Sequence, residues 1–193
     1  MPAYRLTHWL TIGSAIAAWL AASAIQARIP PSLALAVLDE IAHAAVAIAC
    51  TAWLVPRWGW TPVSVAVIAG TAIDLDHAVA AGCLAPSCLM GLSARPALHS
   101  LAGALAASVV VGFVANVRIA YATAIGAALH VWRDATAMPG VPLWFPFDAN
   151  AHVLLPTWSL AVAVAAVAAI NATIAREPDP IFRSKVGRLG LDL

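Results

Sequence analysis

Apolar residues fall into six long blocks, separated by short polar or proline-rich breaks. The blocks cover 8–27, 33–55, 62–82, 97–115, 118–138 and 156–175. Each block is close to the roughly 20 residues that an α-helix needs to cross a bilayer. The breaks contain residues that end helices, such as Pro30 and Gly140. Because no strand-type alternation is present, the pattern predicts about six transmembrane helices and not a barrel.

The composition indicates the same class of protein. Hydrophobic residues make up 63% of the chain and charged residues 10%, and the mean hydropathy is +0.89. A soluble domain has about 45–50% apolar and about 25% charged residues. We therefore expect an all-α, polytopic integral membrane protein, with one helical membrane domain at 1–175 and a tail at 176–193. A net charge of +1 gives no reason to expect a nucleic-acid partner, so the bilayer itself is the expected surrounding.

The basic residues predict the orientation, because cytoplasmic loops carry an excess of Lys and Arg. With six crossings and both termini inside, the cytoplasmic side receives Arg5, Arg57, Arg118, Arg176, Arg183, Lys185 and Arg188. The outer loops receive only Arg28 and Arg95. We therefore expect a multi-pass protein of the cell membrane with both ends in the cytoplasm.

The first apolar block has a second interpretation. A basic residue, Arg5, precedes the apolar run, and Ala-Ile-Gln-Ala follows it, as in a cleaved secretory signal. The apolar run is long for a signal, which favours a helix that is retained.

Three cysteines are present. Cys50 lies in an apolar block and is expected to be a small core residue. Cys83 and Cys88 flank a short loop, CLAPSC, and can pair if this loop faces an oxidising compartment. Free thiols are the alternative.

The four middle blocks each carry ionisable side chains, which membrane helices normally exclude. In chain order these are Asp39, Glu40 and His43, then Asp74, Asp76 and His77, then His99, and last His130, Arg133 and Asp134. In the predicted topology all of them lie at a similar level in the outer half of the membrane. The inner halves of the same blocks are almost purely apolar. We therefore expect one site, built by four helices and open to one side.

A divalent metal ion explains this convergence best, because it supplies positive charge for carboxylates and accepts neutral imidazoles as ligands. His130 and Asp134 are four residues apart and share one helical face. Asp74 and His77, three apart, also share a face, whereas Asp76 points elsewhere on an ideal helix. Both aspartates contribute if they bridge ions or if the helix loosens at its end, or else Asp76 orients an imidazole. A metal-free proton or ion pathway and structural polar packing are the alternatives.

Other polar positions have weaker expectations. Arg133 is a counter-charge or a phosphate ligand, or else its side chain extends to the outer headgroups. The segment 138–156 is rich in proline and aromatic residues and forms either a lid over the site or an interfacial anchor. Within this segment, Asp148 and His152 are candidate additional ligands.

Four motifs in order resemble the YdjM-like family of bacterial and archaeal inner-membrane proteins, which includes LexA-regulated members and is described as metal-dependent hydrolases. The motifs are IDLDH (73–77), RPALHS (95–100), ALHVWRD (128–134) and PGVPLWFP (139–146). The resemblance covers roughly 36–150 and includes His43, which matches an early histidine of the family. It implies an inner-membrane location and a hydrolase core at 36–150.

The second motif departs from the family pattern, which usually reads His-Arg-x-x-Thr-His. Here Ala94 stands at the first histidine and Leu98 at the threonine, while Arg95 and His99 are kept. The family is also similar in its ligand pattern to zinc-dependent phospholipase C and P1 nuclease, whose His-x-x-x-Asp element binds zinc. This similarity implies phosphoester hydrolysis with zinc, or with manganese, as the metal.

The sequence thus leads to a hypothesis of a membrane-bound, metal-dependent hydrolase acting on a phosphoester of a lipid or lipid-linked substrate. The expected metal ligands are His43, Asp74, His77, His99, His130 and Asp134. Asp39 is expected to activate water or support a ligand, Asp76 to act as ligand or base, and Arg95 to contact phosphate. A proton, ion or metal transporter and a catalytically inactive scaffold are the alternatives.

Overall fold

The chain folds into helices, as its sequence predicts. The computed structural model describes residues 2–30, 32–83, 85, 88, 95–96, 98–137, 139–147 and 153–176. Its helices are α1 (Pro2–Gln26), α2 (Leu33–Thr51), η1 (Ala52–Leu54), α3 (Val55–Trp58), α4 (Thr61–Ala72), α5 (Leu75–Ala81), α7 (Leu101–Val114), α8 (Val117–Asp134) and α9 (Trp158–Arg176). Within these residues, the strand-like pairing is limited to an isolated bridge between Val141 and Val153.

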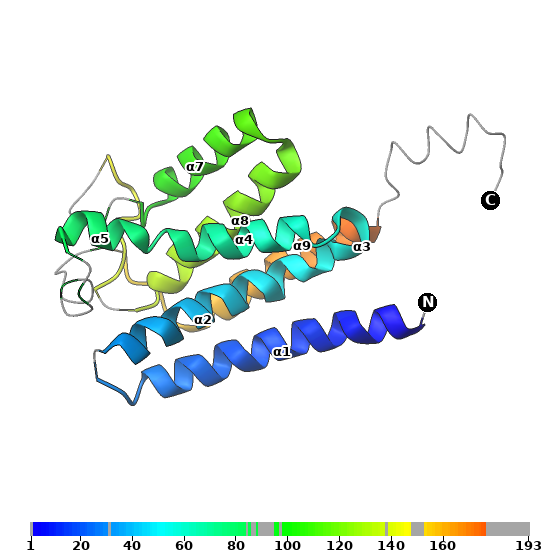
Figure 1. Cartoon of the computed structure of the whole chain (residues 1–193), viewed down its shortest axis with the longest axis horizontal. Coiled ribbons are helices and arrows are strands. Elements are labelled where there is room, and N and C mark those ends of the chain that lie inside the picture. Colours follow the sequence, from blue (N-terminus) through cyan, green and yellow to red (C-terminus); the bar gives the residue numbers. More distant parts are fainter. Residues whose placement is uncertain are drawn as a thin grey trace.

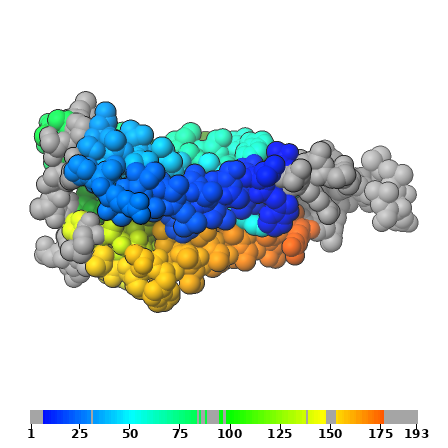
Figure 2. Space-filling view, turned by 90° about the horizontal axis from the view of Figure 1, so that it is seen from below, coloured from blue at the N-terminus to red at the C-terminus, as the bar shows by residue number. Residues whose placement is uncertain are grey.

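The long helices run beside one another along the long axis of the molecule (Figure 1). The α2, α8 and α9 helices share a core cluster, made by Val46, Cys50, Ile125, Leu129, Leu160 and Val164. Trp19 of α1 packs against this cluster, and Figure 2 shows α1 and α9 on the same face of the molecule. The apolar blocks therefore bury small and branched side chains between helices, while many larger ones stay exposed on the outside.

Within the described ranges, four helical stretches are long and apolar enough to cross a membrane. They are Thr7–Gln26, Leu33–Trp58, Thr61–Ala81 and Trp158–Arg176. The second stretch joins α2, η1 and α3 into one rod. The α7 helix has 14 residues and is therefore about 21 Å long, shorter than a hydrocarbon core of roughly 30 Å.

The third apolar block is not one continuous helix. It divides into α4 and α5 at Ile73 and Asp74, where backbone bonds from Asp74 to Thr71 and from His77 to Asp74 span three residues instead of four. Tighter turns of this kind rotate the following residues relative to an ideal α-helix. Asp74 and Asp76 can therefore both face one site, through a tighter turn at the α4–α5 junction and not through a loosened helix end.

The fourth block begins later than predicted. Ser100 is the N-cap of α7, and its hydroxyl accepts a hydrogen bond from Gly103 N at 3.0 Å. His99 therefore precedes the helix and does not lie in its first turn. The extended backbone at Ser100 lets His99 turn back towards α5.

Glycines allow α4 and α8 to approach closely. A Cβ on Gly126 would lie 2.1 Å from Ala66 O, and one on Gly70 would lie 3.2 Å from Gly126 O. Small residues bring helix backbones together in this way in membrane bundles. The close approach places the end of α8 against the end of α4.

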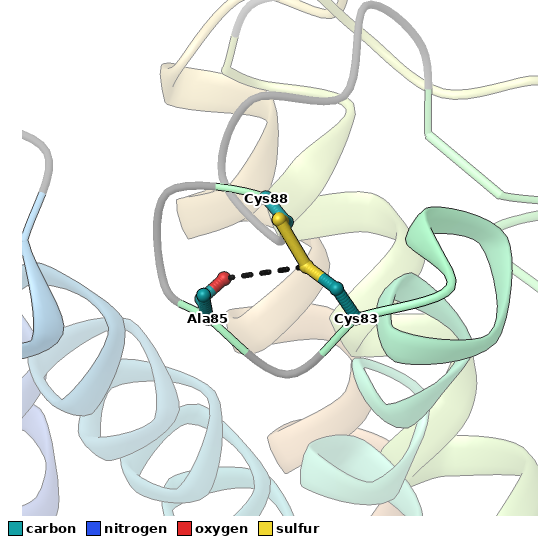
Figure 3. Close-up of a disulfide and its surroundings, with 3 residues drawn as sticks. All are labelled: Cys83, Ala85 and Cys88. Atoms are coloured by element: carbon teal, nitrogen blue, oxygen red, sulfur yellow. Dashed lines mark hydrogen bonds between the residues drawn. A yellow bond between two sulfur atoms is a disulfide. The ribbon is translucent and has the colours of Figure 1, made fainter.

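Cys83 and Cys88 form a disulfide after α5, with Cα atoms 6.3 Å apart (Figure 3). Cys83 Sγ also lies 4.0 Å from the Ala85 carbonyl oxygen. Cys50 is a free, buried cysteine in the core, as predicted.

Candidate metal centre

The predicted site residues come together at one end of the bundle. Asp39 and His43 come from α2, Asp74, Asp76 and His77 from the α4–α5 junction, and His130 and Asp134 from the end of α8. The segment before α7 adds Arg95 and His99. The side chains of His43, His99 and His130 are fully buried, whereas that of Asp39 is 34% exposed. The cluster therefore has a buried base and opens near Asp39.

Four side chains form the tightest group, here called the quartet: Asp74, His99, His130 and Asp134. His99 Nε2 lies 3.1 Å from both His130 Nε2 and Asp74 Oδ1, and 3.3 Å from Asp134 Oδ2. His130 Nε2 lies 3.3 Å from Asp134 Oδ2 and 3.6 Å from Asp74 Oδ1. These five distances describe four ligand atoms around one small space.

A partner on another element orients each imidazole of the quartet. His130 Nδ1 lies 2.5 Å from Gly70 O, a carbonyl that can only accept, so Nδ1 carries the hydrogen. A hydrogen on His99 Nδ1 can bond to Asp76 Oδ2 at 3.3 Å, and a hydrogen on His99 Nε2 can bond to Asp74 Oδ1 at 3.1 Å. The tautomer with the hydrogen on Nδ1 is the one that suits a metal ligand. Both Nε2 atoms are then left with lone pairs that face each other. Histidine ligands of metals typically donate their other N–H to a carbonyl or carboxylate.

The quartet fits a divalent metal ion. Two imidazole lone pairs and two carboxylate oxygens converge, and with these tautomers none of the four atoms has a hydrogen to donate. Zinc ligands at about 2.0–2.1 Å in a tetrahedron are roughly 3.3–3.4 Å apart, and the five distances run from 3.1 to 3.6 Å. The geometry and the donor chemistry therefore both agree with a cation among these four atoms.

His43 lies beside the quartet with a different set of partners. Its ring stacks on that of His130, with centroids 3.8 Å apart. His43 Nε2 lies 3.3 Å from Asp134 Oδ1, and Arg133 Nη1 lies 2.8 Å from the same nitrogen. His43 Nδ1 is buried without a hydrogen-bond partner. Asp134 therefore presents Oδ2 to the quartet and Oδ1 to His43. His43 also forms a second group of potential ligands with Asp39 and Asp74.

His77 lies beside His99, with ring centroids 4.7 Å apart, and faces the same oxygen of Asp74. His77 Nδ1 is 3.3 Å from Asp74 Oδ1 and 3.4 Å from Asp76 Oδ1, without hydrogen-bond geometry to either. His77, Asp76 and His99 form a third group of potential ligands. Asp76 Oδ2 meanwhile accepts a hydrogen bond from Leu98 N at 3.1 Å. Leu98, which replaces the threonine of the family pattern, thus contributes its backbone N–H to the site through this hydrogen bond to Asp76.

Two guanidinium groups balance the carboxylates. Arg95 Nη1 donates to Asp134 Oδ2, and Arg95 Nε is buried with no hydrogen-bond partner. Arg133 Nη1 lies 2.6 Å from Asp39 Oδ1 and Arg133 Nη2 donates to Gln26 Oε1 at 2.9 Å. Arg133 is therefore a counter-charge within the cluster.

Sequence reasoning missed three contributors. Gln26 at the end of α1 also donates to Asp39 Oδ1 at 2.8 Å, so the first helix takes part in the site. The sequence feature that could have indicated this role is the position of Gln26, a polar residue at the outer end of the first apolar block. Gly70 lies four residues before Asp74, on the same face, and contributes only a carbonyl. Glu40, an ionisable group to which the sequence assigned no role, has a buried Oε2 without a hydrogen-bond partner and lies beside Asp74.

Some predictions fall outside the described residues. They concern Asp148 and His152 as additional ligands, the substitution at Ala94, and the tail beyond Arg176. The aromatic segment after α8 exposes Trp144 and Phe147, at 55% and 91%, and its role as lid or anchor remains a prediction.

Comparisons with protein-family models, with curated proteins and with solved structures find no match to this chain. The resemblance to the YdjM-like family therefore remains a prediction.

Proposed function

We propose that this chain is a membrane-bound, metal-dependent hydrolase that acts on a phosphoester of a lipid or lipid-linked substrate. The observation that supports it most is the orientation of His99 and His130. In each ring Nδ1 faces an acceptor outside the quartet, and Nε2 faces two carboxylate oxygens at 3.1–3.6 Å, as in a histidine that ligates a metal through Nε2. A divalent ion, zinc or else manganese, fits there and would supply Lewis-acid catalysis. The resemblance of four motifs to the YdjM-like family points to the same reaction class.

The surrounding residues have chemistry suited to phosphoester hydrolysis. Arg95 Nε has no hydrogen-bond partner in the site, and a guanidinium is well suited to bind a phosphate. Asp39, the more exposed carboxylate at the mouth, is placed to accept a proton from water. Arg133 and Gln26 hold that carboxylate in position. Asp76 orients His99 and is proposed to act through it.

We place the site in the outer half of the cell's inner membrane, with both termini in the cytoplasm. The Cys83–Cys88 disulfide, a feature of oxidising compartments, closes the loop directly after α5. Basic residues gather at the opposite end, where Arg57 donates to Ile174 O and Arg118 lies 5.8 Å from the Trp58 ring. The basic residues agree with the positive-inside rule, and the disulfide agrees with an outer, oxidising side for the opposite end.

Transport is the less favoured function. Among the described residues, the carboxylates are Asp39, Glu40, Asp74, Asp76 and Asp134, all at one end. Away from that end, Thr51 bonds to Ala47 O and Ser108 to Ala104 O within their own helices. Buried Asn171 donates to Cys50 O and accepts from the Tyr121 hydroxyl, and none of these groups is ionised. An ion crossing the membrane needs a polar path through both halves.

The test is to measure metal content and hydrolysis on the same preparations. Wild type purified in detergent and resupplied with zinc or manganese should retain the metal and hydrolyse bis(p-nitrophenyl) phosphate. Asp134→Ala should lose both properties, whereas His8→Ala, a histidine change in α1 away from the cluster, should keep both. Wild type without bound metal would overturn the metal site. Metal without hydrolysis would leave the inactive scaffold as the answer.

A further inference from the structure

An apolar groove of about 450 Å³ lies between α4, α7 and α8. Its lining includes Ile68, Ala72, Leu98, Ala107, Val111 and Thr123. The hydroxyl of Thr123 donates to Ile119 O within its own helix, so it offers no hydrogen to an occupant. Its volume lies within the range of about 300–1,000 Å³ typical of small-molecule sites. The groove therefore suits a purely aliphatic occupant.

One end of the groove meets the metal centre. Ile73 and Leu98 both line the groove, and they directly precede Asp74 and His99 of the quartet. Along α4 the lining runs from Val65 to Ile73, which is about 12 Å of helix. One leaflet contributes about 15 Å of a hydrocarbon core of roughly 30 Å. The groove thus runs from the metal centre along much of one leaflet.

We propose that this groove holds one aliphatic chain of the lipid phosphoester whose head lies at the metal centre. The proposal rests on the hydrolase function above and deepens it by naming the substrate class. The arrangement of charge supports this occupant. The phosphate of such a lipid would contact Arg95 and its chain would pass Leu98, so the lipid needs a charged site directly beside an apolar groove. Both features are present at one end of α7. A bilayer lipid in the outer leaflet has this same order of charged head and apolar chain.

The binding test uses full-length protein in phosphatidylcholine vesicles that contain phosphatidic acid with a diazirine in one acyl chain. After illumination, mass spectrometry should find the label on groove-lining residues of α4 and α7. Ala107→Phe should reduce this labelling about tenfold, equivalent to about 1.4 kcal/mol. Ala106→Phe is the matched control, because Ala106 is also exposed on α7 but does not line the groove. Labelling spread evenly over the outer helix faces would overturn the proposal.

Activity measurements separate this inference from the function on which it rests. With soluble bis(p-nitrophenyl) phosphate, both phenylalanine variants should match wild type. With the lipid, Ala107→Phe should raise KM and leave kcat unchanged. Groove labelling without any hydrolysis would contradict the hydrolase and keep the chain site. Hydrolysis without groove labelling would support the hydrolase and contradict the chain site. Loss of a dimer in Ala107→Phe, seen by native mass spectrometry, would instead identify the groove as an interface between copies and overturn the proposal.

Discussion

The Nε2 atoms of His99 and His130 lie 3.1 Å apart, and the Nδ1 atom of each ring faces an acceptor outside the pair. Two nitrogen lone pairs at this distance repel each other unless a cation or a proton lies between them. Asp74 and Asp134 add negative charge to the same space. The affinity of the site for a metal therefore depends on the groups that set the two tautomers as well as on the four ligands.

Asp76 is one of these groups, and removing its carboxylate should weaken metal binding. Its Oδ2 holds both His99 Nδ1 and Leu98 N. We expect Asp76→Ala to lower zinc affinity about 10–100-fold, the usual cost of losing a partner that orients a histidine ligand. Asp76→Asn should lose less, since the amide oxygen can still accept from His99. Competition with a chromogenic zinc chelator measures this, and wild-type affinity in Asp76→Ala would contradict the assigned role.

Gly126 should be the least replaceable glycine of the bundle. A Cβ at this position would lie 2.1 Å from Ala66 O, so α4 and α8 must separate. We expect Gly126→Ala to destabilise the protein by about 1–3 kcal/mol, as overpacking usually does. Separation of the helices should also lengthen the His130–Gly70 contact and lower zinc content. Thermal unfolding in detergent and elemental analysis measure the two effects.

Gly13 gives the control for this prediction. A Cβ on Gly13 would have no neighbour within 4 Å. Gly13→Ala should therefore be neutral or should stabilise α1 by up to about 1 kcal/mol. Equal behaviour of the two alanine variants would show that the close approach of α4 and α8 is not needed.

The level of the site could be predicted from sequence because it depends only on where polar residues interrupt apolar blocks. His130 and Asp134 share a face in any α-helix, and the structure brings them to one small space. The break at Asp74 could not be predicted with certainty. It depends on backbone hydrogen bonds that span three residues at the α4–α5 junction. The residues at this junction include no proline, so the sequence gives no sign that the helix breaks there.

The partners within the site were harder to predict, because they join residues far apart in the chain. From the sequence, the Arg133 side chain could extend to headgroups or turn inward. The inward orientation depends on a hydrogen bond to Gln26, which precedes Arg133 by 107 residues. The α1 helix supplies that amide only because it packs antiparallel beside α2. No periodicity in either segment carries this information.

Gln26 provides a test of whether α1 belongs to the working site. Gln26→Leu keeps the helix apolar and removes the hydrogen bonds to Asp39 and Arg133. We expect a loss of stability of about 1–2 kcal/mol, in the range of hydrogen bonds between membrane helices. Because Gln26 contacts no member of the quartet, zinc content should be unchanged while hydrolysis falls.

Thr11→Val gives the matched comparison, because Thr11 Oγ1 bonds only to Thr7 O within α1. It should change neither stability nor hydrolysis by much. If Gln26→Leu behaved like Thr11→Val in thermal unfolding and in hydrolysis, α1 would be a membrane anchor without a part in the site.

The sidedness of the metal centre can be tested through the cysteines. Cys83 and Cys88 lie at the end of the molecule that carries the cluster, whereas Cys50 is buried in the core. With the outer face exposed, a membrane-impermeant maleimide should label the protein only after mild reduction. Cys83→Ser/Cys88→Ser should abolish this labelling and Cys50→Ser should leave it unchanged. Labelling that requires permeabilised membranes would place the disulfide loop, and with it the quartet, on the cytoplasmic side. Because α5 joins the disulfide loop directly to Asp74, the metal centre must lie on the same side as the loop. We would then expect a lipid substrate of the inner leaflet instead of the outer leaflet.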